Sequence, residues 1–336
     1  MATKKAAAKK PAAKKAAAKK PLKKVAAKKV VGKFGATKAV ESKSIKQLTL
    51  KEKAATIKPG ALIAEFLGVF ILASVAITFA NTGLEFLLAI IAIIVIFAVI
   101  SGAHLNPAVS FAAWVNRKMY WPKMLSFIAA QALGALLAFF VMGAFINEQN
   151  ATYAEDGTRT VTTIESKLLE MGYVTDSDIQ GKTTQEVVDS VTNGQATVAQ
   201  VASQLGIKSA YEAPAIDAHK ELYVFFAELV GSIIVGLGAG FALLASHKKS
   251  ISCGFAYGGA IFIGLAIAGG AAILNPAVAG AIQAYPLSGE FAVAVWPYII
   301  YMLATTVGVT IGLSMYNVIL KDADTCACGE SNCDCE

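Results

Sequence analysis

The stretch Ser101-Gly-Ala-His-Leu-Asn-Pro-Ala-Val-Ser110 decides how this chain folds. It follows a long apolar run, and its triplet Asn106-Pro107-Ala108 opens an apolar segment that is too short to cross a bilayer. Asn is a favoured N-cap residue, and Pro is tolerated at the first helical position. The triplet therefore predicts a short helix that begins at membrane depth, where helices rarely begin. A second copy, Asn275-Pro276-Ala277, follows another long apolar run and predicts the same arrangement.

The composition is that of a protein that crosses the membrane several times. The chain has 336 residues, of which 56% are hydrophobic and only 16% are charged. Six apolar runs are candidate transmembrane spans: 61–80, 86–103, 124–146, 222–245, 252–274 and 291–320. The segments after the triplets, 108–114 and 277–284, are too short to span. We therefore expect an all-α membrane protein with six transmembrane helices and two re-entrant half-helices.

The membrane part divides into two similar halves. Ala64-Glu65-Phe-Leu-Gly68 in the first span matches Ala227-Glu228-Leu-Val-Gly231 in the fourth, and both Asn-Pro-Ala triplets lie between Leu and Val. The halves are residues 61–146 and 222–320. Because each half has three spans, the second copy enters the bilayer inverted. Inverted repeats whose broken helices converge at the midplane are typical of a permeation path or a binding site.

The charges predict the orientation in the membrane. Residues 1–60 hold nineteen Lys and two acids, whereas residues 147–221 hold twelve acids and five bases. Since positive residues flank the cytoplasmic ends of spans, both termini are expected inside a cell membrane, with the 147–221 segment outside. We call this segment the insertion. We expect a small ordered cap over the outer mouth, with helices near 164–171, 185–191 and 198–205.

Two short patterns in the insertion have alternative interpretations. Asp176-Ser-Asp178 resembles the start of a calcium-binding loop. The twelfth position of such a loop is Val187 instead of an acid, so a solvated loop explains the pattern better. Asn150-Ala-Thr152 is a glycosylation sequon whose use depends on the host.

The inverted three-plus-three repeat, the 101–110 stretch and the second triplet resemble the aquaporin family of water and glycerol channels. The resemblance covers about residues 60–146 and 220–320. It implies a six-helix bundle, usually a homotetramer with one pore per subunit. It also implies that Asn106 and Asn275 donate hydrogen bonds to a permeating hydroxyl or water, near Pro107, Ala108, Pro276 and Ala277.

The resemblance implies roles for buried polar residues as well. Glu65 and Glu228 match glutamates that accept hydrogen bonds from the re-entrant loops, and His104 and Gln131 match residues that brace loops. A carboxylate within a span is costly unless it is paired, which favours this role. The alternative is that both glutamates lie near the interface and extend towards water.

The chain departs from the family at the position that follows the second triplet. The family usually has Arg there, in the narrow outer selectivity filter, and this chain has Val278. The resemblance places Phe86 and Ala272 in the same filter, with a fourth, apolar position within 263–268. An apolar filter without Arg is expected to be wide and to favour glycerol, other polyols, urea or ammonia over water alone. The alternative is that the insertion supplies the missing cation.

The two tails carry separate patterns. Residues 1–60, rich in Lys and Ala, are expected to be disordered and resemble the tails of linker histones. They could fix topology, bind anionic lipid head groups, or bind nucleic acid without reading its sequence. The C-terminal tail, residues 321–336, carries four thiols that could hold zinc or copper(I), or could remain a flexible reduced tail: Cys326, Cys328, Cys333 and Cys335.

Three function classes remain open, and no enzyme is expected because the spans offer no nucleophile, acid–base pair or phosphate loop. The leading one is a passive channel without a cofactor. A coupled secondary transporter would need an ion site or a titrating group in the path, and only Glu65 and Glu228 qualify. A membrane anchor whose basic tail binds nucleic acid or anionic lipid is the third.

Overall fold

The computed structural model describes Thr49, Ala54 and residues 56–79, 83–211, 213, 216, 219–244, 250–269, 272–285 and 291–327. Its membrane helices are α2 (Pro59–Phe79), α3 (Gly83–Ala98), α5 (Trp121–Gln149), α10 (Glu221–Leu244), α11–η2–α12 (Ser250–Ile267) and α14–η3–α15 (Phe291–Ala327). Five of the described helices are long and apolar enough to cross a membrane, and α3 is a shorter apolar helix. The chain is therefore a multi-pass, all-α membrane protein, as predicted.

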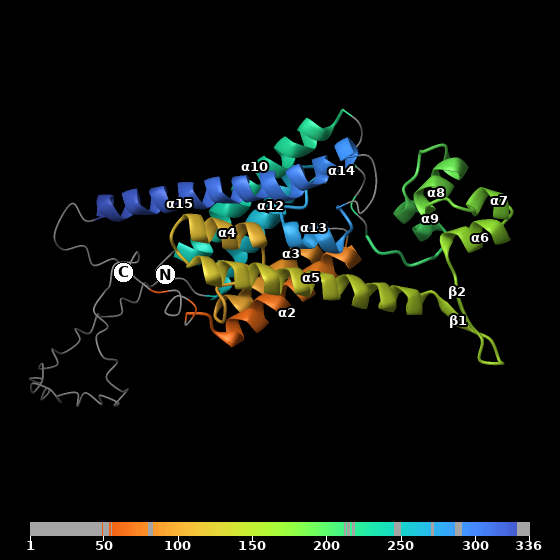
Figure 1. Ribbon diagram of the computed structural model, residues 1–336, viewed down its shortest axis with the longest axis horizontal. Helices are drawn as coiled ribbons and strands as arrows, with labels where there is room; N and C mark the ends of the chain where they lie inside the picture. The colour runs from red at the N-terminus through yellow and green to blue at the C-terminus, as the bar shows by residue number, and fades with distance from the viewer. Residues whose placement is uncertain are drawn as a thin grey trace, which may run out of the picture. The chain divides into compact units, whose positions relative to one another are not determined.

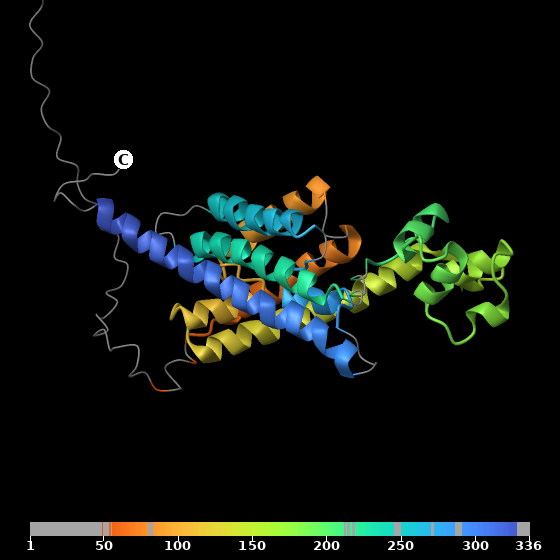
Figure 2. The same cartoon turned by 90° about the horizontal axis from the view of Figure 1, so that it is seen from above.

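Two helix pairs make up most of the membrane part. Helix α2 packs along α5, and α10 packs along α15 (Figures 1 and 2). Glycines allow this close approach: a Cβ on Gly134 of α5 would lie 2.3 Å from the carbonyl oxygen of Phe66, and one on Gly308 of α15 would lie 2.5 Å from that of Leu229. These glycines therefore allow close helix packing within this chain.

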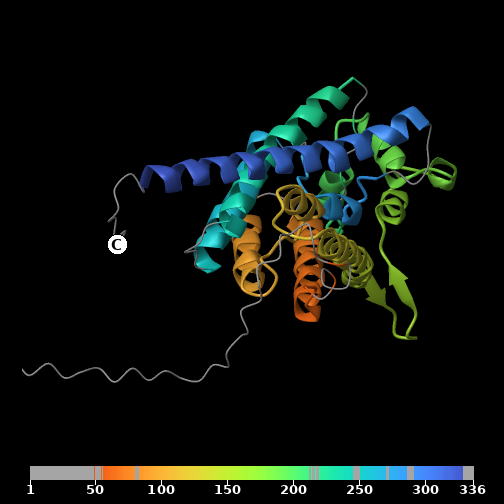
Figure 3. The same cartoon turned by 60° about the vertical axis from the view of Figure 1, so that its left-hand side comes forward.

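The half-helices are α4 (Pro107–Val115) and α13 (Pro276–Ala281). They lie next to each other in the middle of the bundle (Figure 3). Asn106 caps α4 and Asn275 caps α13, with Pro at the first helical position in both. The Asn cap and the following Pro thus predict the starts of both helices correctly.

Two spans end earlier than their apolar composition suggests. Helix α3 ends at Ala98, although the apolar run continues to residue 103, and α12 ends at Ile267, although the run continues to residue 274. The residues that follow are extended or turn-forming, and Ala103, Leu105 and Leu274 adopt positive φ angles of 50°, 49° and 62°. Apolar composition alone cannot distinguish these buried loops from helix.

The insertion folds around a hydrophobic cluster of its own, which includes Leu168, Val187, Val188 and Ala202. Its helices are α6 (Ile164–Glu170), α7 (Asp176–Ile179), α8 (Thr184–Thr192) and α9 (Val198–Gln204). Three of them match the predicted periods, whereas α7 and the hairpin of β1 (Ala151–Tyr153) and β2 (Arg159–Val161) were not predicted.

Threonines begin all four helices of the insertion. Thr163, Thr175, Thr183 and Thr197 each exchange hydrogen bonds with the residue three positions later, which is a capping box. In α7 the Asp178 carboxylate accepts from the Thr175 backbone N–H at 2.8 Å. The pattern that resembles a calcium loop is thus a helix start, because its second carboxylate serves as a cap.

Candidate functional site

The two triplets are cross-linked through their asparagines. The Asn106 Nδ2 donates to the Leu274 carbonyl at 2.8 Å, and the Asn275 Nδ2 donates to the Leu105 carbonyl at 2.9 Å. Each Oδ1 accepts from a backbone N–H of its own half-helix, at 2.9 Å from Ala108 and 3.0 Å from Ala277. An amide nitrogen has two protons, so each asparagine retains one donor beyond its cross-link.

Two buried glutamates hold the loops that lead to the asparagines. Glu65 is fully buried and accepts from the backbone N–H groups of His104 at 3.0 Å and Leu105 at 2.7 Å. Glu228 is also fully buried and accepts from Ile273 and Leu274, both at 2.8 Å. Two N–H donors per carboxylate offset the cost of burying the charge.

Each glutamate has one further, different donor. Gln131 Nε2 donates to Glu65 at 2.7 Å, while the Thr305 hydroxyl donates to Glu228 at 2.6 Å. The third hydrogen bond to the glutamate thus comes from a different type of side chain in each repeat. For this reason a comparison of the two halves in sequence did not reveal Thr305.

A glycine one helical turn after each glutamate makes room for the leucine before the triplet. A Cβ on Gly68 would lie 2.4 Å from Leu105 Cδ2, and one on Gly231 would lie 2.7 Å from Leu274 Cδ2. The repeated Ala-Glu-x-x-Gly pattern is thus a single device: the glutamate binds the loop backbone, and the glycine accommodates the loop side chain.

His104 lies within the same polar network as Glu65. Its Nδ1 is 3.2 Å from the Ser110 hydroxyl oxygen, and its backbone carbonyl accepts from the Tyr257 hydroxyl at 2.9 Å. Gln131 Nε2 also donates to Ser110, at 3.0 Å. No sequence pattern marks Tyr257, which lies in the π-helical segment η2 (Gly254–Gly258).

A narrow cavity adjoins the asparagine pair. The volume open to the centres of water molecules in this cavity is about 20 Å³, and a single water requires roughly 10–15 Å³ of such volume. Its lining is apolar apart from the two asparagines: Leu72, Ala76, Phe86, Asn106, Ile261, Leu265, Ile273, Leu274, Asn275 and Val278. None of these described lining residues is charged.

The lining differs in part from the filter expected from the sequence. Phe86 and Val278 line the cavity, whereas Ala272 is not among the lining residues and the adjacent Ile273 is. Leu265 is the lining residue from the 263–268 interval. The cavity is narrow, and the large side chains Phe86 and Leu265 are part of its lining.

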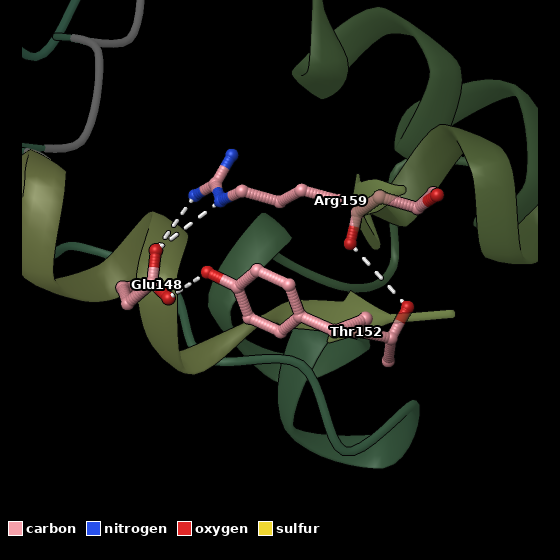
Figure 4. Close-up of polar contacts among 5 residues, drawn as sticks. Glu148, Thr152 and Arg159 are labelled. Atoms are coloured by element: carbon pink, nitrogen blue, oxygen red, sulfur yellow. Dashed lines mark hydrogen bonds and ion pairs between the residues drawn. The ribbon is translucent and has the colours of Figure 1, made fainter. Parts of the chain in front are cut away.

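The Arg of the insertion is committed to another partner. Arg159 donates to the Glu148 carboxylate from Nη2 at 2.9 Å and from Nε at 3.2 Å, and the Tyr153 hydroxyl bonds the same carboxylate (Figure 4). Hydrogen bonds to Glu148 raise the pKa of Arg159 above its ordinary value. This pairing joins both strands of the hairpin to the end of α5 and gives Arg159 a partner outside the cavity lining.

Most residues of the two tails lie outside the described part of the chain. Residues 1–48 lie outside the described residues, and so do Cys328, Cys333 and Cys335. Cys326 lies within α15, but its side chain is not described. Among the described residues there is no group of three or more side chains suited to a metal ion.

Known proteins resemble part of this chain. The chain matches the Major intrinsic protein family over residues 53–203. It is 36% identical over 109 residues to "Aquaporin-B" of Dictyostelium discoideum, covering 28% of this chain and 37% of that protein. It is 38% identical over 93 residues to "Glycerol uptake facilitator protein-like 6" of Lactiplantibacillus plantarum, covering 25% of this chain and 43% of that protein.

The matched regions thus span less than half the length of these curated relatives. Among solved structures, the aquaglyceroporin from Plasmodium falciparum has a TM-score of 0.48 and 20% sequence identity, with 79% of this chain and 98% of that chain covered. The match over residues 53–203 includes the first buried glutamate and the first triplet. The chain is thus similar to the Major intrinsic protein family over residues 53–203.

Proposed function

We propose that this protein is a passive membrane channel for water and small neutral solutes, such as glycerol, other polyols, urea and ammonia. The observation that carries the proposal is the cross-linked pair Asn106 and Asn275 beside an otherwise apolar cavity. Each asparagine has one N–H donor left, which suits the oxygen of a water or an alcohol.

The surroundings of the pair disfavour cations. Backbone N–H groups at the start of α4 point towards the asparagines, and the helix dipole places partial positive charge there. An apolar wall cannot replace the hydration shell of an ion, so dehydration opposes entry of any charge. Neutral molecules that need only one or two hydrogen bonds meet a smaller barrier.

The filter residues we propose are Phe86, Leu265 and Val278. With no charged side chain at these positions, selection among neutral solutes depends on size and on the ability to lose water. This composition supports passage of small solutes that have an apolar face, in addition to water. Because the cavity is narrow, we expect glycerol to pass more slowly than water.

A passive channel fits the contacts better than a coupled transporter. A transporter needs a titrating or ion-binding group in its path, and the two candidates, Glu65 and Glu228, are fully buried against loop backbone and do not line the cavity. Enzymatic activity is not part of the proposal, and the channel needs no cofactor.

Further features of the proposal come from the family and from charge. They are a homotetrameric assembly, a cell-membrane location with both termini cytoplasmic, and binding of anionic lipid or nucleic acid by the basic tail. The tail is not required for permeation in this account.

Osmotic flux measurements in proteoliposomes test the proposal. A passive channel gives water flux that does not change when proton or sodium gradients are imposed, and the flux survives deletion of residues 1–50. Flux that follows an ion gradient would indicate a coupled transporter. Loss of nucleic-acid retention on deletion, with no flux in either form, would indicate a tether instead.

A further inference from the structure

The insertion returns to the membrane part through a short segment that contacts both repeats. The Tyr211 N–H donates to the Ile77 carbonyl at 2.8 Å, and the Ala213 N–H donates to the Ile282 carbonyl at 2.8 Å. Tyr211 and Ala213 also pack against the hydrophobic cluster of the membrane part. We call residues 208–211 and 213 the strap.

Both carbonyls that the strap binds are at helix ends. Ile77 is in the last turn of α2, and Ile282 is the C-cap of α13. The last four carbonyls of a helix have no partner within the helix. The strap therefore provides N–H donors for carbonyl groups that have no partner within their own helices.

The same two helices both contribute to the cavity wall. Ala76 of α2 lines the cavity and precedes Ile77 directly, and Val278 of α13 lines it one turn before Ile282. Helix α2 belongs to the first repeat and α13 to the second. Tyr211 and Ala213 are two positions apart in the sequence, so the strap links the two helices through a short length of chain.

The start of the strap is also fixed. Asn150, the C-cap of α5, accepts from the Lys208 N–H at 2.9 Å through Oδ1 and donates to the Lys208 carbonyl at 2.7 Å through Nδ2. The strap is therefore held at Lys208, Tyr211 and Ala213 by three different helices. The two bonds to Lys208 engage both Oδ1 and Nδ2 of Asn150, the asparagine of the glycosylation sequon.

We propose that Tyr211 and Ala213 are positioning residues that set the size of solute the channel admits, by holding α2 and α13 at a fixed separation. The inference rests on the proposed channel function. A cavity with room for one or two waters is sensitive to small wall movements, so a loosened connection widens it.

The test compares proline substitutions in the strap. Ala213→Pro removes the N–H that binds Ile282. Ala210→Pro is the matched control, because the N–H of Ala210 has no backbone partner among the described residues. Water and glycerol permeabilities are measured in proteoliposomes, together with thermal stability in detergent. Asn150→Ala, which removes the anchor at Lys208, is a second variant in case Ala213→Pro does not fold.

We expect Ala213→Pro to raise the ratio of glycerol to water permeability by about threefold or more. A tenfold change in this ratio corresponds to about 1.4 kcal/mol in the difference between the two permeation barriers, and a threefold change corresponds to roughly half of that. Asn150→Ala is expected to shift the ratio in the same direction, and Ala210→Pro to leave it unchanged. Lower stability with an unchanged ratio in both variants would overturn the inference and leave a structural role. Absence of flux in the unmodified protein would instead overturn the channel function itself.

Discussion

Asn106 and Asn275 are each bonded to the backbone carbonyl that precedes the other, at 2.8 and 2.9 Å. The two halves of the chain are thus joined at the point where their half-helices begin. Each side chain closes the turn of its own helix and holds the opposite loop at the same time. An Asn is suited to this double task because one end of its amide accepts hydrogen bonds and the other donates them.

Replacing Asn106 by Asp removes the donor end of this pair. A carboxylate oxygen would then face the Leu274 carbonyl, which is repulsive in a buried site. We expect Asn106→Asp to destabilise the protein by about 2–4 kcal/mol and to reduce water flux. Asn193→Asp is the control, because Asn193 is an exposed C-cap of α8. Equal thermal stability of Asn106→Asp and the unmodified protein in detergent would contradict the account.

Replacing Glu65 by Gln tests the bracing of the first loop. Its carboxylate accepts from His104 N, Leu105 N and Gln131 Nε2, and a Gln amide would present N–H groups to some of these donors. We expect a loss of about 2–4 kcal/mol for Glu65→Gln, measured as a lower melting temperature. The exposed Glu85 provides the control Glu85→Gln, for which we expect less than about 0.5 kcal/mol. If both variants melt alike, Glu65 does not brace the loop.

Two glycines of α5 form a matched pair for testing helix packing. A Cβ at position 134 would lie 2.3 Å from a backbone oxygen, whereas at Gly143 nothing lies within 4 Å. Gly134→Ala is therefore expected to destabilise the protein by about 1–3 kcal/mol or more through overpacking. Gly143→Ala is expected to be neutral or to stabilise α5 by up to about 1 kcal/mol, because Ala favours helix. The order of the two melting temperatures in detergent checks this, and the reverse order would contradict the α2–α5 packing.

Shortening Leu265 is expected to enlarge the cavity. Leu265 lines it, while Ile263, two residues earlier, is 50% exposed and does not. Leu265→Ala should raise glycerol permeability relative to water by about threefold or more, and Ile263→Ala should not. A glycerol-to-water ratio that is the same in both variants would exclude Leu265 from the filter.

The insertion should lose stability in acid. The Glu186 carboxylate accepts from the Thr183 N–H at 2.7 Å and from its hydroxyl at 3.0 Å, and these bonds lower the pKa of Glu186. The Thr175 hydroxyl and N–H likewise lower the pKa of Asp178. For such carboxylates the stabilising contribution is present above the unfolded pKa, about 4, and disappears as the pH falls through the lower folded value.

Hydrogen exchange of residues 164–205, corrected for intrinsic rates, should therefore show reduced protection below about pH 4. Glu186→Gln is the informative variant, because Gln also completes a capping box but does not titrate. In this variant the pH dependence of α8 should be smaller. Protection that does not change between neutral and acidic pH in the unmodified protein would contradict this assignment.

Local patterns predicted much of the fold. The triplets predict α4 and α13 because an Asn cap followed by Pro specifies a helix start, and the positive charge of 1–60 together with long apolar runs predicts a membrane protein. The ends of α3 and α12 were not predictable, because the apolar composition of a span continues to Leu105 and Leu274. The backbone N–H groups of these two leucines are bonded to the buried Glu65 and Glu228, which are distant in the sequence.

The site was predicted less completely than the fold. Asn106, Phe86 and Val278 could be named from the triplets and the resemblance, but the cavity wall depends on which large side chain reaches it. Ile273 rather than Ala272 lines the cavity, and Leu265 is the residue of the 263–268 interval that lines it. Thr305 and Tyr257 lie far along the sequence from the loops they bind, and no local pattern marks them.

The most direct test of the central claim is light scattering from proteoliposomes after matched osmotic shocks with an impermeant sugar and with glycerol. We expect shrinkage in both shocks that is much faster than that of empty vesicles, followed by slower re-swelling only in glycerol. Shrinkage no faster than that of empty vesicles in either shock would contradict the claim that Asn106 and Asn275 mark a path for neutral solutes.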